Sequence, residues 1–219
     1  MTSASKLSAL ASSVAYAETF VPQPPGCQAA RDRALDLGLV SVSEGVVTTI
    51  GLLARIIGAK NVVEIGTGTG VATLALLAGM APDGVLTSID PENELQLVAR
   101  EILNAQGVPF RRARLIAGQP LVVLPKLTDQ AYDLLFVNGD PLEYVEYVDQ
   151  ATRLLRPGGL LVVHHALWNN TVADDRIDAD EPFIIREALA AVSEMAVPTA
   201  LWPIGDGLLI AVIGEQRAN

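Results

Sequence analysis

Five short hydrophobic runs, almost without interruption, recur along the middle of the chain. They are NVVEIG (61–66), GVLTSID (84–90), RARLIAG (112–118), YDLLFVN (132–138) and LLVVHH (160–165). Such runs are typical of parallel strands that are covered on both faces. Helical segments separate them, at 70–80, 92–106, about 119–126 and 141–156. This alternation predicts an α/β fold with a parallel sheet and right-handed crossovers.

The last part of the chain has a different pattern. After a predicted helix near 181–195, the apolar runs TALWPI and LLIAVIG flank the turn Gly205-Asp206-Gly207. Two apolar runs around such a turn predict a β-hairpin, so the sheet ends with an antiparallel strand. The segment LLRPGG (154–159) predicts a helix end followed by a turn into the next strand.

The first part of the chain is helical. Two or three helices are predicted within residues 1–58, and PQPPG (22–26) breaks them. Neither an internal repeat nor a domain boundary is visible. We therefore expect one domain over 1–219, with a helical part at 1–58 and the sheet with its helices at 61–214.

Composition narrows the class of protein. Half of the 219 residues are hydrophobic and 18% are charged, as expected of a packed globular chain. The one cysteine, Cys27, excludes an internal disulfide and fits a reducing compartment. A formal charge of −10 disfavours nucleic acid as a partner. The arginines at 111, 112 and 114 form the one basic cluster, which we interpret as a solvated edge.

No apolar stretch approaches the roughly 20 residues that span a bilayer, so no membrane association is expected. The start, MTSASKLSALASSVAYA, superficially resembles a signal peptide. Serines interrupt its apolar run, however, and we favour an amphipathic helix in a cytoplasmic protein.

The segment VVEIGTGTG (62–70) is a strand that leads into glycines and then a helix. Glycines there allow a tight turn and close approach of the backbone to a ligand. The spacing is not G-x-G-x-x-G, and Glu64 beside the loop would repel a pyrophosphate. It suits a ligand that carries an amine and a sulfonium, while Asp90 at the next strand end can bind ribose hydroxyls. These features favour S-adenosylmethionine; the alternative is a loop that only makes a tight turn.

Five segments together resemble a known family. VVEIGTGTGVATLALLA, SIDPE, YDLLFVNGDPLEYVEY, LLRPGGLLVVHHALW and PIGDGLLIA are similar, in order and spacing, to the O-methyltransferases related to catechol and caffeoyl-CoA O-methyltransferases. The similarity covers roughly residues 38 to 214. It implies the Rossmann-like class I methyltransferase fold, with a seven-stranded sheet whose last strand is antiparallel. It also implies a homodimer.

The resemblance also implies a set of cofactor-binding positions. They are Val42, Glu64, Gly66, Thr67, Gly68, Asp90, Gly118 and Asn138. Within this set, Asp90 would bind the ribose and Gly118 would lie beside the adenine. One position departs from the family, because Ala72 replaces a serine that holds the methionine carboxylate.

The family's divalent-cation site is degenerate in this chain. Asn138 stands where a ligand aspartate is expected, and Pro141 replaces a basic lysine. His164 and His165 replace an Asp-Asn pair. Because Mg²⁺ prefers charged oxygen ligands, we expect no Mg²⁺ and no metal site of the family's kind.

Three roles remain open for the two histidines, which we take as the candidate catalytic residues. Imidazoles could bind a softer metal, with Asp140 adding a carboxylate, although successive strand residues point to opposite faces. One histidine could act as a general base, since imidazole titrates near pH 6.5. Alternatively, one is packed and the other is hydrogen-bonded. Asp140 is also our candidate for contact with the substrate.

The function predicted from the sequence is S-adenosylmethionine-dependent O-methylation of a small hydroxylated acceptor, without Mg²⁺. The acceptor is not expected to be a simple catechol, because the usual activating groups are replaced. A non-catalytic or regulatory S-adenosylmethionine-binding protein is the alternative. A nicotinamide-dependent oxidoreductase is disfavoured by Glu64 and the glycine spacing.

Overall fold

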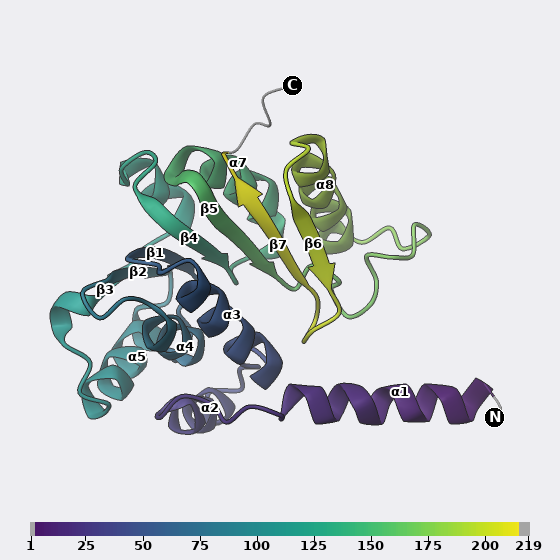
Figure 1. Cartoon of the computed structure of the whole chain (residues 1–219), viewed down its shortest axis with the longest axis horizontal. Helices are drawn as coiled ribbons and strands as arrows, with labels where there is room; N and C mark the ends of the chain where they lie inside the picture. Colours follow the sequence, from purple (N-terminus) through teal and green to yellow (C-terminus); the bar gives the residue numbers. More distant parts are fainter. Residues whose placement is uncertain (1–2, 215–219) are drawn as a thin grey trace.

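The hydrophobic runs form a single seven-stranded sheet in a computed structural model that describes residues 3–214 (Figure 1). The strand order is β3-β2-β1-β4-β5-β7-β6. The strands are β1 (Asn61–Ile65), β2 (Val85–Asp90), β3 (Ala113–Ala117), β4 (Tyr132–Val137), β5 (Leu155–His164), β6 (Thr199–Trp202) and β7 (Leu208–Ile213).

Strands β1 to β5 pair in parallel, and β7 lies antiparallel between β5 and β6. The predicted fold class and terminal hairpin are thus confirmed. The predicted start of β5 is wrong, because the strand begins at Leu155 directly after a helix. The proline and glycines lie within the strand, where the pairing of β4 with β5 shifts register and Gly158 has φ +78°. Only the later part of the strand is a continuous apolar run, so the hydrophobic pattern did not indicate where the strand begins.

The helices fall close to their predicted ranges. They are α1 (Ser3–Glu18), α2 (Cys27–Asp36), α3 (Glu44–Ile56), α4 (Val71–Gly79), α5 (Asn93–Ala105), α6 (Pro120–Val123), α7 (Tyr144–Leu154) and α8 (Asp180–Glu194), with short 3₁₀ turns η1 (Phe110–Arg112), η2 (Leu124–Lys126) and η3 (Pro141–Glu143). Two predicted helices are divided: 119–126 into α6 and η2, and 141–156 into η3 and α7. Pro125 and Pro141 lie in these 3₁₀ turns, where a missing backbone N–H costs little.

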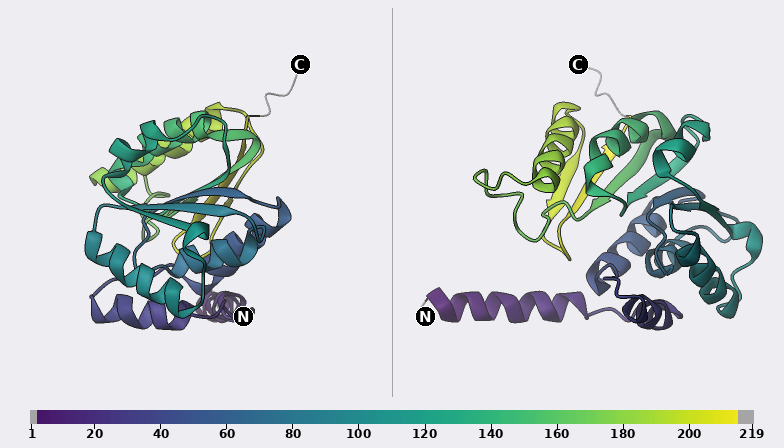
Figure 2. Two further views of the ribbon diagram at one scale, coloured as in Figure 1. Left: turned by 90° about the vertical axis from the view of Figure 1, so that its left-hand side faces the viewer. Right: turned by 180° about the vertical axis from the view of Figure 1, so that it is seen from behind.

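Helices cover both faces of the sheet (Figure 2), which separates two hydrophobic layers. Val62 of β1 belongs to the layer that includes α3 and α4, whereas the adjacent Val63 belongs to the layer that includes α7 and α8. Successive strand residues point to opposite faces, so both faces of β1 are buried. This explains why its hydrophobic run does not alternate.

Helix α1 extends along one side of the molecule (Figures 1 and 2). Its last residue, Glu18, accepts hydrogen bonds from the backbone N–H groups of Gly45 (2.7 Å) and Gly205 (2.9 Å). One carboxylate therefore joins α1 to the start of α3 and to the β6–β7 loop. Within residues 3–214, none of the helices combines the length and hydropathy needed to cross a bilayer.

Candidate active site

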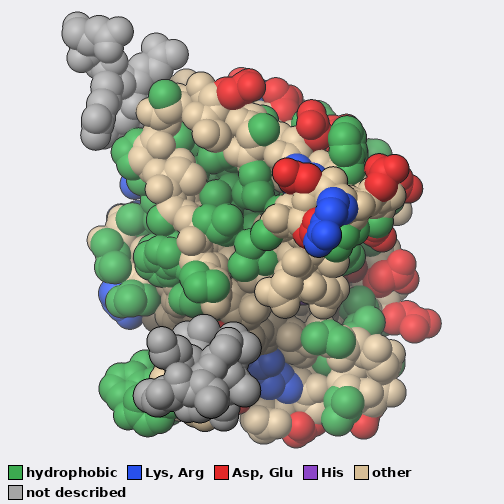
Figure 3. All heavy atoms as spheres, turned by 90° about the vertical axis from the view of Figure 1, so that its right-hand side faces the viewer, with side chains coloured by type: hydrophobic (Ala, Val, Ile, Leu, Met, Phe, Trp, Pro, Cys, Tyr) green, Lys and Arg blue, Asp and Glu red, His purple; other side chains and the backbone are tan. Residues whose placement is uncertain are grey.

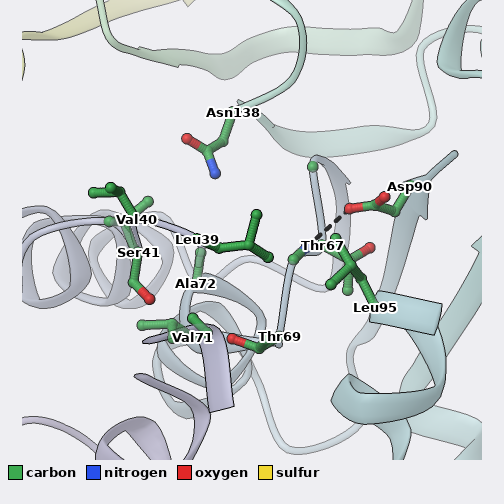
Figure 4. Close-up of a pocket in the computed structure, with 14 residues that line it drawn as sticks. Leu39, Val40, Ser41, Thr67, Thr69, Val71, Ala72, Asp90, Leu95 and Asn138 are labelled. Atoms are coloured by element: carbon green, nitrogen blue, oxygen red, sulfur yellow. Dashed lines mark hydrogen bonds between the residues drawn. The ribbon is translucent and has the colours of Figure 1, made fainter. Parts of the chain in front are cut away.

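A cavity of about 210 Å³ lies at the carboxyl ends of the parallel strands, where open α/β sheets bind ligands (Figure 4). The glycine loop between β1 and α4 forms its floor. Gly66, Gly68 and Gly70 have φ values of +87°, +51° and +94°, which explains the glycines in the sequence. The lining residues are Ala34, Leu39, Val40, Ser41, Val42, Gly66, Thr67, Gly68, Thr69, Val71, Ala72, Asp90, Leu95 and Asn138.

Most of the predicted cofactor positions meet at this cavity. Val42, Gly66, Thr67, Gly68, Asp90 and Asn138 all line it, although they come from four separate segments. Glu64 and Gly118 are not among the lining residues.

The segment 39–41 contributes to the cavity but was not predicted to do so. The sequence does contain a feature that could have indicated this role, because Leu39 and Val40 are apolar residues in a segment between two helices. Val40 is 96% exposed, so its apolar side chain is free to contact a ligand.

Asp90 stabilises the glycine loop while facing the cavity. Its Oδ2 accepts from the Gly68 N–H (2.9 Å), the contact drawn as a dashed line in Figure 4, and its Oδ1 accepts from the Glu92 N–H (2.9 Å). A carboxylate oxygen can accept more than one hydrogen bond. Asp90 can therefore still accept hydrogen bonds from two ligand hydroxyls.

Glu64 is fully buried beside the same loop. Its Oε2 accepts a hydrogen bond from the Thr73 hydroxyl (2.6 Å), and its Oε1 has no partner among the described residues. Burial raises the pKa of Glu64 to about 7, against the effect of the Ser88 and Thr73 hydroxyls. An unpartnered buried carboxylate oxygen favours a cationic ligand group nearby, so the residues present fit S-adenosylmethionine.

His164 is the last residue of β5 and is only 2% exposed. Its Nδ1 lies 2.8 Å from Oδ1 of Asn138. With the amide oxygen accepting, Nδ1 carries the proton and the amide nitrogen of Asn138 points toward the cavity (Figure 4). The Nε2 atom is buried without a partner among the described residues. Burial and, to a smaller extent, the neighbouring His165 lower the pKa of His164 to about 3, so the ring is neutral at physiological pH.

His165 has a different environment. Its Nδ1 lies 2.8 Å from Oδ2 of Asp206, and its side chain is 32% exposed. Because a carboxylate only accepts, Nδ1 donates and a neutral ring keeps its lone pair on Nε2. The other oxygen of Asp206 accepts from the Asn169 N–H (2.6 Å). This is the arrangement of a histidine base oriented by a carboxylate.

The strand ends at His164, and His165 has φ +57°. This left-handed conformation is uncommon for a residue other than glycine and often marks a functional site. It turns the chain so that the two imidazole rings lie side by side, with centroids 3.9 Å apart. The rings therefore do not point to opposite faces, as a continuing strand would require.

Asp140, the predicted substrate contact, is exposed and caps the start of η3, where its Oδ1 accepts a hydrogen bond from the Leu142 N–H (3.0 Å). Within residues 3–214, Asp140 forms no hydrogen bond with either histidine. In the same range, no three His, Cys, Asp or Glu side chains are grouped so that they could hold a metal ion.

Asp206 was not predicted as a site residue. It lies in the Gly-Asp-Gly turn, which the sequence pattern explains completely as a hairpin turn. The contact with His165 spans 41 residues of sequence. Only the pairing of β7 with β5 brings the turn to the end of β5.

The sheet order, with an antiparallel β7 and a glycine loop at the end of β1, defines a Rossmann-like methyltransferase fold. The model of the O-methyltransferase family matches residues 29–213, so the chain belongs to that family.

Individual relatives agree with this assignment. A protein of Mycobacterium sp. (strain JLS) named "Putative O-methyltransferase" is 44% identical over 200 residues, which are 90% of each chain. A crystal structure from Corynebacterium glutamicum has a TM-score of 0.85 at 28% identity, covering 96% of this chain and 100% of that one. The O-methyltransferase TomG from Streptomyces achromogenes, solved in complex with SAM, has a TM-score of 0.81 at 24% identity, over 91% and 94% of the two chains.

Proposed function

We propose that the chain transfers a methyl group from S-adenosylmethionine to the hydroxyl of a small acceptor, with His165 as the general base. The hydrogen bond between His165 and Asp206 is the observation that carries this proposal. A protein that only bound the cofactor would not require a partly exposed histidine that a carboxylate orients.

The bound cofactor would supply an electrophilic methyl group on its sulfonium. The chain's own part is to hold the acceptor oxygen in line with that methyl and to remove its proton. His165 would accept this proton at Nε2, and Asp206 would stabilise the resulting imidazolium. Asn138, fixed by His164, would present its amide N–H to the cavity. Positioning alone can lower such a barrier by several kcal/mol.

His165 is a better base than His164 for two reasons. The side chain of His165 is partly exposed, whereas His164 is almost completely buried. The low pKa of His164, about 3, also makes it a weak proton acceptor at neutral pH. We assign His164 the role of holding Asn138.

Two measurements test the function. Thermal-shift assays should show stabilisation by S-adenosylhomocysteine and none by NAD, which separates the methyltransferase from an oxidoreductase. Turnover of labelled S-adenosylmethionine against phenols and hydroxy acids should then give a methylated product. Cofactor binding without turnover on any acceptor would favour the regulatory alternative.

Cofactor binding is expected to depend on Asp90. Asp90→Ala should weaken binding of S-adenosylhomocysteine by about 1.5–3 kcal/mol, the scale of hydrogen bonds to a charged group. Titration calorimetry measures the change. Asp83→Ala removes the same charge from an exposed position and is the control. Unchanged affinity in both Asp90→Ala and Glu64→Ala would overturn the assignment.

Activity and cofactor binding should be indifferent to Mg²⁺ and to mild chelation. The positions that match the family's ligands are Asn138, His164 and His165, and none is a carboxylate. Adding Mg²⁺ or EDTA to the assay checks this. The triple change Asn138→Asp, His164→Asp and His165→Asn should create Mg²⁺ affinity. A stoichiometric divalent ion bound by the three unmodified side chains would contradict the proposal.

We also propose a homodimer. Tyr16, in the last turn of α1, and Phe20, just after this helix, are 69% and 66% exposed, and Leu201 and Trp202 are exposed on the edge strand β6. Hydrophobic side chains gather on the face shown in Figure 3. A second copy covering such a surface would remove apolar area from water. Sedimentation at micromolar concentration should give twice the monomer mass; a monomer mass would contradict it.

A further inference from the structure

A second cavity, of about 330 Å³, lies at the other end of the sheet from the candidate active site. Asn61, Val85 and Tyr132 are the first residues of β1, β2 and β4, so this cavity is at the amino ends of the parallel strands. It is lined by Asn61, Val85, Thr87, Arg111, Arg114, Ala131 and Tyr132. The proposed methyltransferase activity uses none of these residues.

Two unpaired cations line this cavity. Among the described residues, neither Arg111 nor Arg114 has a hydrogen-bond or ion-pair partner, although the chain carries a net charge of −10. The neighbouring Arg112 differs, because its guanidinium donates to the carbonyls of Gly84 (3.3 Å) and Ala81 (3.0 Å). Arg112 is structural, whereas the two arginines beside it are available to a ligand.

Thr87 supplies a second, independent observation. Its side chain is only 3% exposed, it lines the cavity, and its hydroxyl has no hydrogen-bond partner among the described residues. The β2–β3 register places Thr87 beside Arg114, so both side chains lie on the same face of the sheet. The hydroxyl is therefore free to donate a hydrogen bond to a ligand in the cavity.

The carboxylate that adjoins the lining residue Tyr132 in the sequence does not neutralise the site. Asp133, next to Tyr132, accepts from the backbone N–H groups of Lys60 (2.7 Å) and Asn61 (2.8 Å) and pairs with Arg156 (2.5 Å). Its charge is thus already matched by other groups, and the two free guanidinium groups face the cavity uncompensated.

We propose that this cavity binds a small ligand that carries a phosphate group. Guanidinium groups match phosphate oxygens in geometry and charge, and a hydroxyl donor completes an oxyanion site. Val85 and the ring of Tyr132 offer an apolar wall for an organic part. The ligand that supplies the phosphate group is therefore either free phosphate or a phosphorylated small molecule.

Calorimetry with inorganic phosphate and with phenyl phosphate tests the proposal at constant ionic strength. The protein is first saturated with S-adenosylhomocysteine, so that neither probe is measured at the candidate active site. We expect at least one probe to bind with 1:1 stoichiometry. Equal affinities would identify free phosphate as the ligand, and tighter binding of phenyl phosphate would identify a phosphorylated organic molecule.

Three variants distinguish binding by specific side chains in the cavity from nonspecific attraction of an anion to positive charge. Thr87→Val keeps the shape of the side chain and should lower affinity about tenfold or more by removing one hydrogen bond to an anion. Arg114→Ala should have at least that effect. Arg176→Ala removes a remote exposed arginine and should leave affinity unchanged. Failure of both probes to bind, unchanged affinity in Thr87→Val and Arg114→Ala, or an equal loss in Arg176→Ala would overturn the proposal.

Discussion

His165→Asn is expected to lower kcat by about 10²–10⁴-fold, the usual contribution of a positioned general base. Asparagine is the appropriate replacement because it tolerates a left-handed backbone, and His165 has φ +57°. The fold should therefore survive while the proton acceptor is lost. Cofactor affinity should change little, because His165 is not among the residues that line the cofactor cavity.

The pH profile gives this prediction a second readout. In the parent protein kcat/KM should rise with pH, because only the unprotonated base accepts a proton, and this rise should disappear in His165→Asn. Asp206→Asn should also reduce kcat, because an amide can favour the wrong imidazole tautomer. His164→Gln should affect the rate less, since it can still hydrogen-bond to Asn138. A large loss in His164→Gln beside an unchanged His165→Asn would contradict the assignment of the base.

The protonation of His164 also predicts how stability depends on pH. Its pKa is about 3 in the folded protein and about 6.5 in an unfolded chain. Between these values the unfolded state binds more protons, so this residue makes stability fall as pH decreases from 6.5 toward 3. Glu64 acts in the opposite direction between about pH 4.5 and 7, because its pKa is raised in the folded protein.

Periodicity predicts most of the fold because β1, β2 and β4 are buried on both faces. Their sequences are mostly apolar and do not alternate, as expected of strands that are covered on both faces. The beginning of β5 could not be predicted in this way. Arg156, Pro157 and two glycines precede its apolar part, and only pairing with β4 and β7 makes them strand.

The residues of the candidate site likewise fall into those that the sequence predicts and those that it does not. Residues supplied by strand ends and the glycine loop, such as Asp90 and Gly68, could be predicted because a parallel sheet brings strand ends together. Asp206 could not, because its contact with His165 depends on the path of the β6–β7 loop. The relative burial of His164 and His165, which decides between them as base, also arises only from tertiary packing.

Gly66→Ala is expected to destabilise the protein severely. A Cβ at this position would lie 2.1 Å from the carbonyl oxygen of Asn138, and Gly66 has φ +87°. Neither the carbonyl nor the loop can move freely, because the Asn138 N–H donates to Ile65 (2.8 Å) and the Gly66 N–H donates to Ile89 (2.9 Å). A steric clash between backbone atoms combined with strain should cost about 3 kcal/mol or more. The melting temperature should fall by about 6–12 °C or more.

Gly68→Ala is the matched control for this prediction. Gly68 also has positive φ, at +51°, but nothing lies within 4 Å of its Cβ position. Only backbone strain of about 1 kcal/mol remains, so the melting temperature without ligand should fall by about 2–4 °C. Because Gly68 lines the cofactor cavity, its methyl group should instead weaken binding of S-adenosylhomocysteine. Equal melting temperatures for the two variants would show that the close contact between Gly66 and Asn138 does not constrain the fold. A clear separation would show that the glycines have different roles, since Gly66 allows β1 and β4 to approach and Gly68 leaves room for the cofactor.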